Sequence, residues 1–247
     1  MKGFLRALGF LTVVPVRREA AGDGDFTRAA PWFPCVGLLI GTTLALAHGA
    51  LHAVFPPLLS SALVVAFWAA LTGGLHLDGL CDSCDALFAS VTRERRLEIL
   101  RDPHSGAFGT TALCLFLILK VAAVDELQAP AWLPLLLAPT AARWLVLAVA
   151  TRPSARPEGL GAVFGRGLGR RQLLQAAPVP IALLIVSFYS SGWRGPAALL
   201  LAVVATGCAA LAAARRLGGI TGDILGLSIE LAELSTLLPF TIESPTQ

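Results

Sequence analysis

Three aspartates lie close together in an otherwise apolar stretch of the chain. Asp78, Asp82 and Asp85 follow one another at intervals of four and three residues, which places them on one face of a helix. Carboxylates this close repel one another unless a cation lies among them, and such oxygen ligands favour Mg²⁺ or Mn²⁺. The spacing therefore predicts a metal site, with Mg²⁺ as the expected ion. An acidic helix face in water is the alternative, and the apolar flanks disfavour it.

Basic residues follow the aspartates within one charged segment at 92–101. Guanidinium groups beside carboxylates that hold a metal suit a phosphate-bearing substrate. The candidates for substrate binding are Arg93, Arg95, Arg96 and Arg101. Each of them can equally anchor the chain at a membrane surface or pair with Glu94 or Glu98. Two further residues, His76 and Asp102, are candidates for a general base, and the sequence does not choose between them.

A second glycine-rich stretch, LGGITGDILG, covers residues 217–226. It lacks the lysine of a P-loop, but free N–H groups at the start of a helix can still bind phosphate. We therefore expect Thr221, Gly222 and Asp223 to contact the substrate. The alternative is that Asp223 only caps the helix that follows.

The composition indicates an integral membrane protein. The 247 residues are 55% hydrophobic and only 14% charged, whereas soluble domains average about 25% charged residues. Apolar runs near the length of about 20 residues that spans a bilayer lie at 32–55, 58–75, 107–124, 131–150, 173–189 and 196–214. The run at 224–242 is either a seventh span or an amphipathic helix on the bundle. We expect one all-α catalytic domain over 1–247, with the aspartates on a short helix at 77–91.

The distribution of basic residues predicts the orientation. With the N-terminus in the cytoplasm and six alternating spans, sixteen of the nineteen Lys and Arg residues fall in cytoplasmic segments. Only Arg194 lies in an external turn, as the positive-inside rule requires. The layout puts the aspartates, the 151–171 loop and the 215–226 loop on the cytoplasmic face of the inner membrane. With a net charge of only +3, we expect no nucleic-acid partner.

Two basic residues fall within the predicted spans. A charge inside a membrane is by default functional, so Arg143 is a further candidate for substrate binding. Lys120 lies four residues from the outer end of its span and is expected to extend its amine to the membrane surface. Cys81 and Cys84 form a C-x-x-C pair beside His76, but without a second pair we interpret them as packing residues.

Three motifs together resemble one family. They are GGLHLDGLCDSCDALF at 73–88, RRLEILRDPHSGAFG at 95–109 and LGGITGDILGLSIELAEL at 217–234, with weaker likeness at 10–16, 32–41 and 156–164. The chain resembles the cobalamin synthases, which are adenosylcobinamide-GDP ribazoletransferases. The resemblance implies a membrane-bound, Mg²⁺-dependent enzyme that joins α-ribazole or its 5′-phosphate to adenosylcobinamide-GDP and releases GMP.

Several positions depart from the family pattern, although the three aspartates are intact. Cys81, Ser83 and Ala86 stand where the family has alanine, threonine and glycine. Pro103 and His104 replace a Ser-Arg pair, so His104 or Arg101 would have to supply one phosphate contact. The aspartate spacing is also similar to that of CDP-alcohol phosphotransferases, which is one alternative function. A cation-coupled transporter with buried carboxylates is the other.

Overall fold

The computed structural model describes residues 2–16, 25–128, 130–156 and 158–243. These residues form helices and no strand, as expected. The long elements are α3 (Phe33–His52), α4 (Pro57–Leu71), α5 (Leu75–Phe88), α7 (Ala107–Asp125), α8 (Trp132–Ala150), α11 (Pro178–Ser191), α12 (Arg194–Arg216) and α13 (Gly222–Leu237). The short ones are α1 (Lys2–Leu11), α2 (Asp25–Ala29), η1 (Ala30–Trp32), α6 (Arg93–Ile99), α9 (Leu160–Gly165), α10 (Arg170–Ala176) and η2 (Leu238–Thr241).

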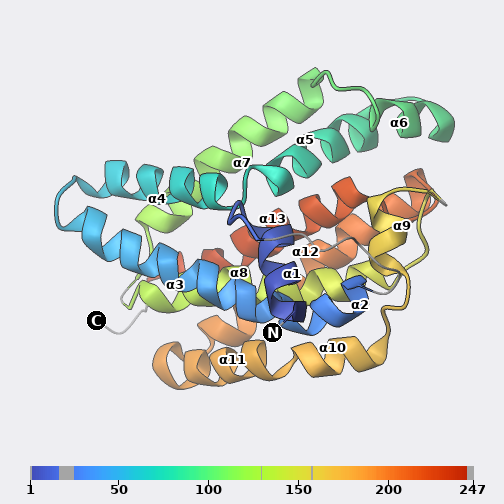
Figure 1. The fold of residues 1–247 in the computed structure, drawn as a ribbon. Coiled ribbons are helices and arrows are strands. Elements are labelled where there is room, and N and C mark those ends of the chain that lie inside the picture. The colour runs from blue at the N-terminus through green and yellow to red at the C-terminus, as the bar shows by residue number, and fades with distance from the viewer. Residues whose placement is uncertain (1, 17–24, 129, 157, 244–247) are drawn as a thin grey trace.

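The described part of the chain contains five helical segments that are long and apolar enough to cross a membrane. Two bent pairs, α4 with α5 and α10 with α11, bring the number to seven if each pair is one span. The prediction of an all-α protein with six to seven spans is confirmed. Figure 1 shows α6, α9 and the turn between α12 and α13 at one end of the bundle, and the turn between α3 and α4 at the other.

Helices α3 and α8 pack with their backbones close together. Gly37 and Gly41 lie four residues apart on α3, a spacing that favours tight helix packing in membranes. A Cβ atom on Gly41 would lie 2.6 Å from the carbonyl oxygen of Leu135. The same face of α3 meets α8 at Pro139, a proline inside that helix. This pair forms one wall of the core below the aspartate helix.

The helix that carries the aspartates begins at a sharp break. Gly73 and Gly74 have φ angles of 65° and 68°, a left-handed conformation that residues with a Cβ atom adopt at a cost. Helix α4 ends before them and α5 begins after them, with a bend of 90° between the two. The sequence led us to expect a span continuing to residue 75 and a separate helix at 77–91. The two glycines instead start the aspartate helix at Leu75.

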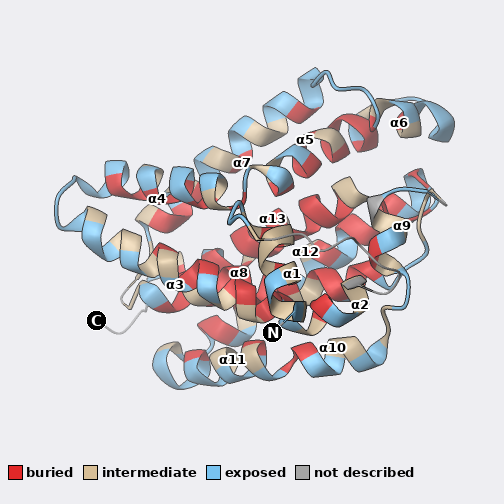
Figure 2. Cartoon of the chain, viewed as in Figure 1, coloured by how far each residue is buried: buried red, intermediate tan, exposed pale blue. Residues whose placement is uncertain are grey.

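Helix α13 lies in the centre of the bundle. It packs against α5, α8 and α12, and Figure 2 shows most of its surface buried. Of the two alternatives that the sequence left open for this run, the structure excludes the amphipathic surface helix and agrees with an apolar helix long enough to span a membrane. The two glutamates that suggested a polar face, Glu230 and Glu233, are 3% and 0% exposed.

Both glutamates have buried cationic partners. Lys120 of α7 donates hydrogen bonds to Glu230 Oε2 at 2.8 Å and to Glu233 Oε2 at 2.6 Å. Arg143 of α8 pairs with the other oxygen of Glu233, and the amine of Lys120 lies 4.0 Å from the centre of the Trp68 ring. The expectation that Lys120 extends to the membrane surface is wrong, because two carboxylates one helical turn apart on α13 hold it at 3% exposure.

Candidate active site

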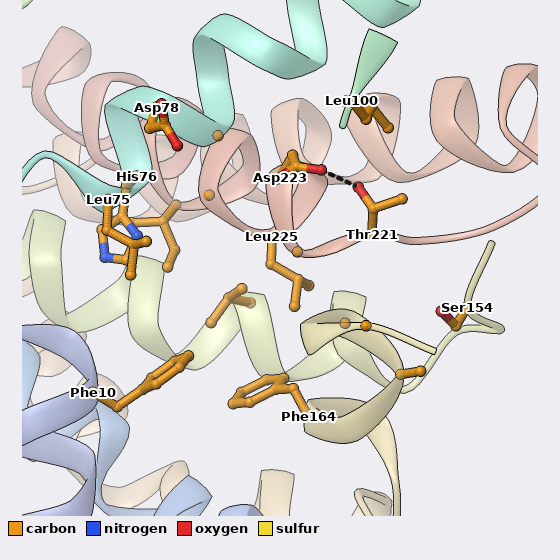
Figure 3. A pocket seen from close by; sticks show the side chains of 18 of the residues that line it. Phe10, Leu75, His76, Asp78, Leu100, Ser154, Phe164, Thr221, Asp223 and Leu225 are labelled. Atoms are coloured by element: carbon orange, nitrogen blue, oxygen red, sulfur yellow. Dashed lines mark hydrogen bonds between the residues drawn. The ribbon is translucent and has the colours of Figure 1, made fainter. Parts of the chain in front are cut away.

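A cavity of about 190 Å³ lies where α1, α3, α5, α9 and α13 meet. Its polar lining residues are His76, Asp78, Ser154, Arg156, Glu158, Thr221 and Asp223. In Figure 3, Asp78, Asp223 and Thr221 lie toward one end of this space and the rings of Phe10 and Phe164 toward the other. The structure therefore brings the first aspartate of the 78–85 motif together with the 221–223 loop.

Close contact between α5 and α13 joins these two motifs. A Cβ atom on Gly79 would lie 2.8 Å from the carbonyl oxygen of Asp223 and 3.2 Å from the Cα atom of Gly226. Only glycine allows the two backbones to approach so closely. Asp78 and Asp223 both line the cavity at this crossing, whereas Asp82 does not line it and lies within electrostatic range of both.

Asp85 has a different environment from the other two aspartates of the motif. It is buried, and its oxygens accept hydrogen bonds from the backbone N–H groups of Gly106 at 2.7 Å and Gly109 at 2.8 Å. Those N–H groups belong to the first turn of α7, where a carboxylate is favourable. Asp85 therefore connects α5 to the start of α7, and its predicted metal role has no supporting contact.

Thr221 caps the N-terminus of α13. Its Oγ1 accepts a hydrogen bond from the N–H group of Ile224 at 3.3 Å, and its hydroxyl contacts Asp223 Oδ2 at 3.2 Å. Thr221 is thus the N-cap residue, which leaves the half-buried carboxylate of Asp223 available to the cavity. Gly222 also lines the cavity. It is the first residue of α13, and the first N–H groups of a helix have no hydrogen-bond partner within the helix.

The two candidate bases lie in different places. His76 is 4% exposed, lines the cavity, and its Nε2 atom has no hydrogen-bond partner among the described residues. Asp102 does not line the cavity, and its side chain is 52% exposed. Hydrogen bonds from the backbone and the ring of His104 lower the pKa of Asp102. The structure therefore brings only His76 into the site.

Most of the predicted arginines contact the protein itself. Arg96 is buried and donates to the carbonyl groups of Ala86 and Leu87 at the end of α5. Arg93 donates to the carbonyl oxygen of Leu217 at 2.8 Å.

The remaining three predicted arginines do not line the cavity either. Arg95 forms an exposed ion pair with Glu98 at 2.7 Å, and Arg101 is exposed. Arg143 is fully buried in its ion pair with Glu233. A substrate role for any of these five arginines stays a prediction.

Arg156 is the arginine that does line the cavity, and sequence reasoning missed it. Its Nη2 donates to the carbonyl oxygen of Leu97 at 2.7 Å, while its Nε has no partner within the described residues. Partial burial and the nearby Arg101 lower the pKa of Arg156, and Asp223 partly offsets that effect. A short parallel β-bridge between Ser154 and Ile220 holds this loop beside the 217–221 loop. The RPEGLGAVF motif at 156–164 begins with Arg156, so the weaker family likeness of this segment could have identified the residue.

An aromatic cluster at the other end of the cavity was also missed. Phe10, Phe33 and Phe164 line the cavity, and the centres of their rings are 5.3–6.0 Å apart. Phe26 packs behind them, 5.1 Å from Phe10 and 5.4 Å from Phe164. No pattern in the sequence distinguishes these rings, because phenylalanines are common throughout the apolar segments of a membrane protein.

The donor groups at the crossing suit Mg²⁺ in kind. In the part of the chain that the structure describes, no three His, Cys, Asp or Glu side chains converge closely enough to hold an ion by themselves. Mg²⁺ is commonly held by one or two carboxylates together with substrate phosphates and water. Asp78 and Asp223 line the cavity and supply two such carboxylates, and Asp82 lies within electrostatic range of both.

Comparison with known proteins places the chain in a family. No solved structure matches it. A protein from Syntrophobacter fumaroxidans named adenosylcobinamide-GDP ribazoletransferase is 42% identical over 241 residues, with 95% of this chain and 96% of that protein covered. A protein of the same name from Pseudomonas aeruginosa is 39% identical over 246 residues, with 98% of each chain covered. The family model described as cobalamin-5-phosphate synthase matches residues 3–241. The chain therefore belongs to the cobalamin-5-phosphate synthase family.

Proposed function

We propose that this protein transfers α-ribazole or α-ribazole 5′-phosphate onto adenosylcobinamide-GDP and releases GMP. The observation that carries the proposal is that Asp78, Asp223 and Arg156 line one cavity, with Asp82 within electrostatic range of both carboxylates. Carboxylates and a guanidinium around one space suit a pyrophosphate. The relatives are named adenosylcobinamide-GDP ribazoletransferases. These names favour ribazole transfer over both alternatives, cation transport and a CDP-alcohol phosphotransferase reaction.

The reaction exchanges the phosphoanhydride bond of adenosylcobinamide-GDP for a phosphate ester bond to ribazole. A hydroxyl oxygen of ribazole attacks the phosphorus that carries the cobinamide, and the bond from that phosphorus to the GMP oxygen breaks. His76 accepts the proton of the attacking hydroxyl, because its Nε2 has no partner among the described residues and the residue lines the cavity. The electron pair of the broken bond leaves with GMP, whose phosphate then carries the negative charge.

Arg156 and the start of α13 bind the phosphate groups. The Nε of Arg156 has no partner in the described structure, and the first N–H groups of a helix attract anions. Mg²⁺, held by Asp78, Asp82 and Asp223, would neutralise the phosphoryl oxygens and stabilise the leaving group. Asp85 positions α7 relative to these residues and does not contact the substrate. This assignment replaces Asp85 by Asp223 in the ligand set expected from the sequence.

We place the site at the cytoplasmic face of the inner membrane, on the basis of the basic residues. Cysteine labelling of intact cells tests this orientation. Glu158→Cys, at the exposed loop beside the cavity, should react only after the membrane is opened, whereas Val54→Cys, at the opposite end, should react from outside. Reaction of both positions from the same side would contradict the proposed orientation.

The activity is tested with purified protein in detergent or lipid nanodiscs. GMP should appear only when adenosylcobinamide-GDP, ribazole and Mg²⁺ are all present, and EDTA should stop its release until Mg²⁺ is added back. Asp82→Asn should abolish release. The matched control is Asp125→Asn at the far end of α7, where an asparagine oxygen can still accept the hydrogen bond from Ser61. Formation of GMP without ribazole would indicate hydrolysis and would overturn the proposed transfer.

A further inference from the structure

The aromatic end of the cavity has the features of a binding site for a flat ring system. Phe10, Phe33 and Phe164 come from three separate parts of the chain, α1, α3 and α9, and meet at ring distances of 5.3–6.0 Å. The rings of Phe10 and Phe164 are nearly parallel, with an angle of 12° between their planes. All three rings line a cavity whose opposite end carries the carboxylates (Figure 3).

The size of the cavity limits what can enter it. An apolar protein cavity of about 150 Å³ accommodates a single benzene ring, and this cavity measures about 190 Å³. It therefore has room for one small ring system and not for a whole nucleotide, which sites of about 300–1,000 Å³ accommodate. One aromatic part of a larger substrate fits here while the remainder extends outward past the carboxylates.

The two substrates of the proposed reaction offer two aromatic bases, guanine and the dimethylbenzimidazole of ribazole. The edges of guanine carry several hydrogen-bond donors and acceptors, and burying them against phenylalanine rings without partners is unfavourable. The benzimidazole has a methylated, apolar edge and a single ring-nitrogen acceptor, so it loses less than guanine in this environment and gains stacking with the rings. The chemistry of the wall therefore selects the benzimidazole base.

We propose that Phe10, Phe33 and Phe164 form the subsite for the benzimidazole base of ribazole, and that this subsite determines acceptor specificity. The inference rests on the proposed function. It also explains why the aromatic rings and the carboxylates lie at opposite ends of the cavity. A base held at the aromatic end directs its ribose hydroxyls toward Asp78, His76 and Asp223. GDP-activated cobinamide then approaches from the carboxylate end, where Arg156 lies.

Equilibrium binding of α-ribazole to the full-length protein, without the corrinoid substrate, tests the subsite. Phe10→Leu and Phe164→Leu keep an apolar side chain but remove the ring. Because loss of one aromatic stacking partner weakens base binding by about 5- to 150-fold, each variant should raise the Kd of α-ribazole by that factor. The Kd of GMP should not change. Phe188→Leu is the control, since Phe188 lies on α11, is 54% exposed and does not line the cavity.

The outcomes separate the subsite from the reaction itself. An unchanged ribazole Kd in both ring variants overturns the subsite, as does a raised Kd for GMP, which would place guanine at the rings. Absence of ribazole binding by the wild-type protein also overturns it. Phe10 is only half-buried, so Phe10→Leu remains informative if Phe164→Leu does not fold. Release of GMP by the wild-type protein is measured in parallel, and its failure would refute the proposed function whatever the binding data show.

Discussion

The carboxylate of Asp85 joins α5 to α7 by accepting hydrogen bonds from the N–H groups of Gly106 and Gly109, at 2.7 and 2.8 Å. Each oxygen of Asp85 thus accepts one hydrogen bond at the start of α7. Asp82, one turn earlier on α5, is half-buried and lies within electrostatic range of Asp78, Asp223 and Asp85. The sequence places Asp78, Asp82 and Asp85 on one helix face and suggests one common role. In the structure the carboxylate of Asp85 also links α5 to α7, and its part in metal binding stays a prediction.

The first prediction separates Asp85 from Asp82. In Asp85→Asn the new NH₂ group would face a backbone N–H group, so one hydrogen bond is lost in a buried place. We expect the free energy of unfolding to fall by about 1–3 kcal/mol. Asp82→Asn should leave stability unchanged or slightly higher, because it relieves repulsion among carboxylates, and should abolish GMP release. Thermal unfolding in detergent, measured with activity, checks both variants. Equal stability of the two variants would contradict the capping role of Asp85.

The second prediction separates Thr221 from Asp223. Thr221→Val removes the hydroxyl that caps α13 and should cost about 1 kcal/mol of stability. Asp223→Asn retains the cap and should hardly change the melting temperature, yet it should lower turnover by at least about 100-fold because a charge is lost beside the substrate phosphates. Full activity of Asp223→Asn would show that the charge of Asp223 has no catalytic role and that the 217–226 loop only connects α12 to α13.

The third prediction concerns the base. His76→Gln, a neutral change of similar size, should lower kcat by about 10²- to 10⁴-fold while the binding of GMP persists. Asp102→Asn should retain activity, since Asp102 does not line the cavity. Hydrogen bonds from His104 lower the pKa of Asp102. Because that pKa is lowered on folding, the stabilising contribution of the Asp102 turn is present above the unfolded pKa and is lost as pH falls through the folded value.

A profile of kcat against pH for His76→Gln and Asp102→Asn would decide which of the two residues is the base.

Much of the architecture was predictable from the sequence. The apolar runs and the basic residues between them specify the number of spans, because the bilayer fixes the length of a spanning helix. The break between α4 and α5 was less accessible. The paired glycines at 73–74 were visible, but a left-handed conformation at both residues depends on how α4 and α5 pack. The position of α13 in the core was also unresolved, since Glu230 and Glu233 suggest a surface until their partners on α7 and α8 are known.

The site was predictable in its motifs and less so in its individual residues. Charge and spacing pointed correctly to His76, Asp78 and the 221–223 loop as neighbours. The arginines nearest in sequence to the aspartates did not follow this pattern: Arg93 and Arg96 bind backbone carbonyls, while the cavity receives Arg156 from a loop far along the chain. Guanidinium groups serve equally well for a substrate phosphate and for an open helix end. Sequence spacing cannot distinguish these two uses.

The buried charges beneath the site give the last prediction. Lys120 is held between Glu230 and Glu233, and Arg143 pairs with Glu233, so two cations balance two carboxylates in the core. Lys120→Met leaves one carboxylate without a counter-charge, which in a buried pair costs about 3–5 kcal/mol. The control is Arg95→Met, which removes an exposed basic residue whose ion pair contributes at most about 1 kcal/mol.

A second substitution tests whether the loss comes from charge or from packing. The double variant Lys120→Met with Glu230→Gln restores neutrality, because Arg143 and Glu233 remain as a pair. Its stability should recover most of the loss seen in Lys120→Met, and the melting temperatures of the two single variants and the double variant form a cycle that isolates the coupling. If Lys120→Met instead melts like the unmodified protein, the amine reaches the membrane surface as the sequence first suggested. In that case α13 is fixed in the bundle by apolar packing and by Arg143 alone.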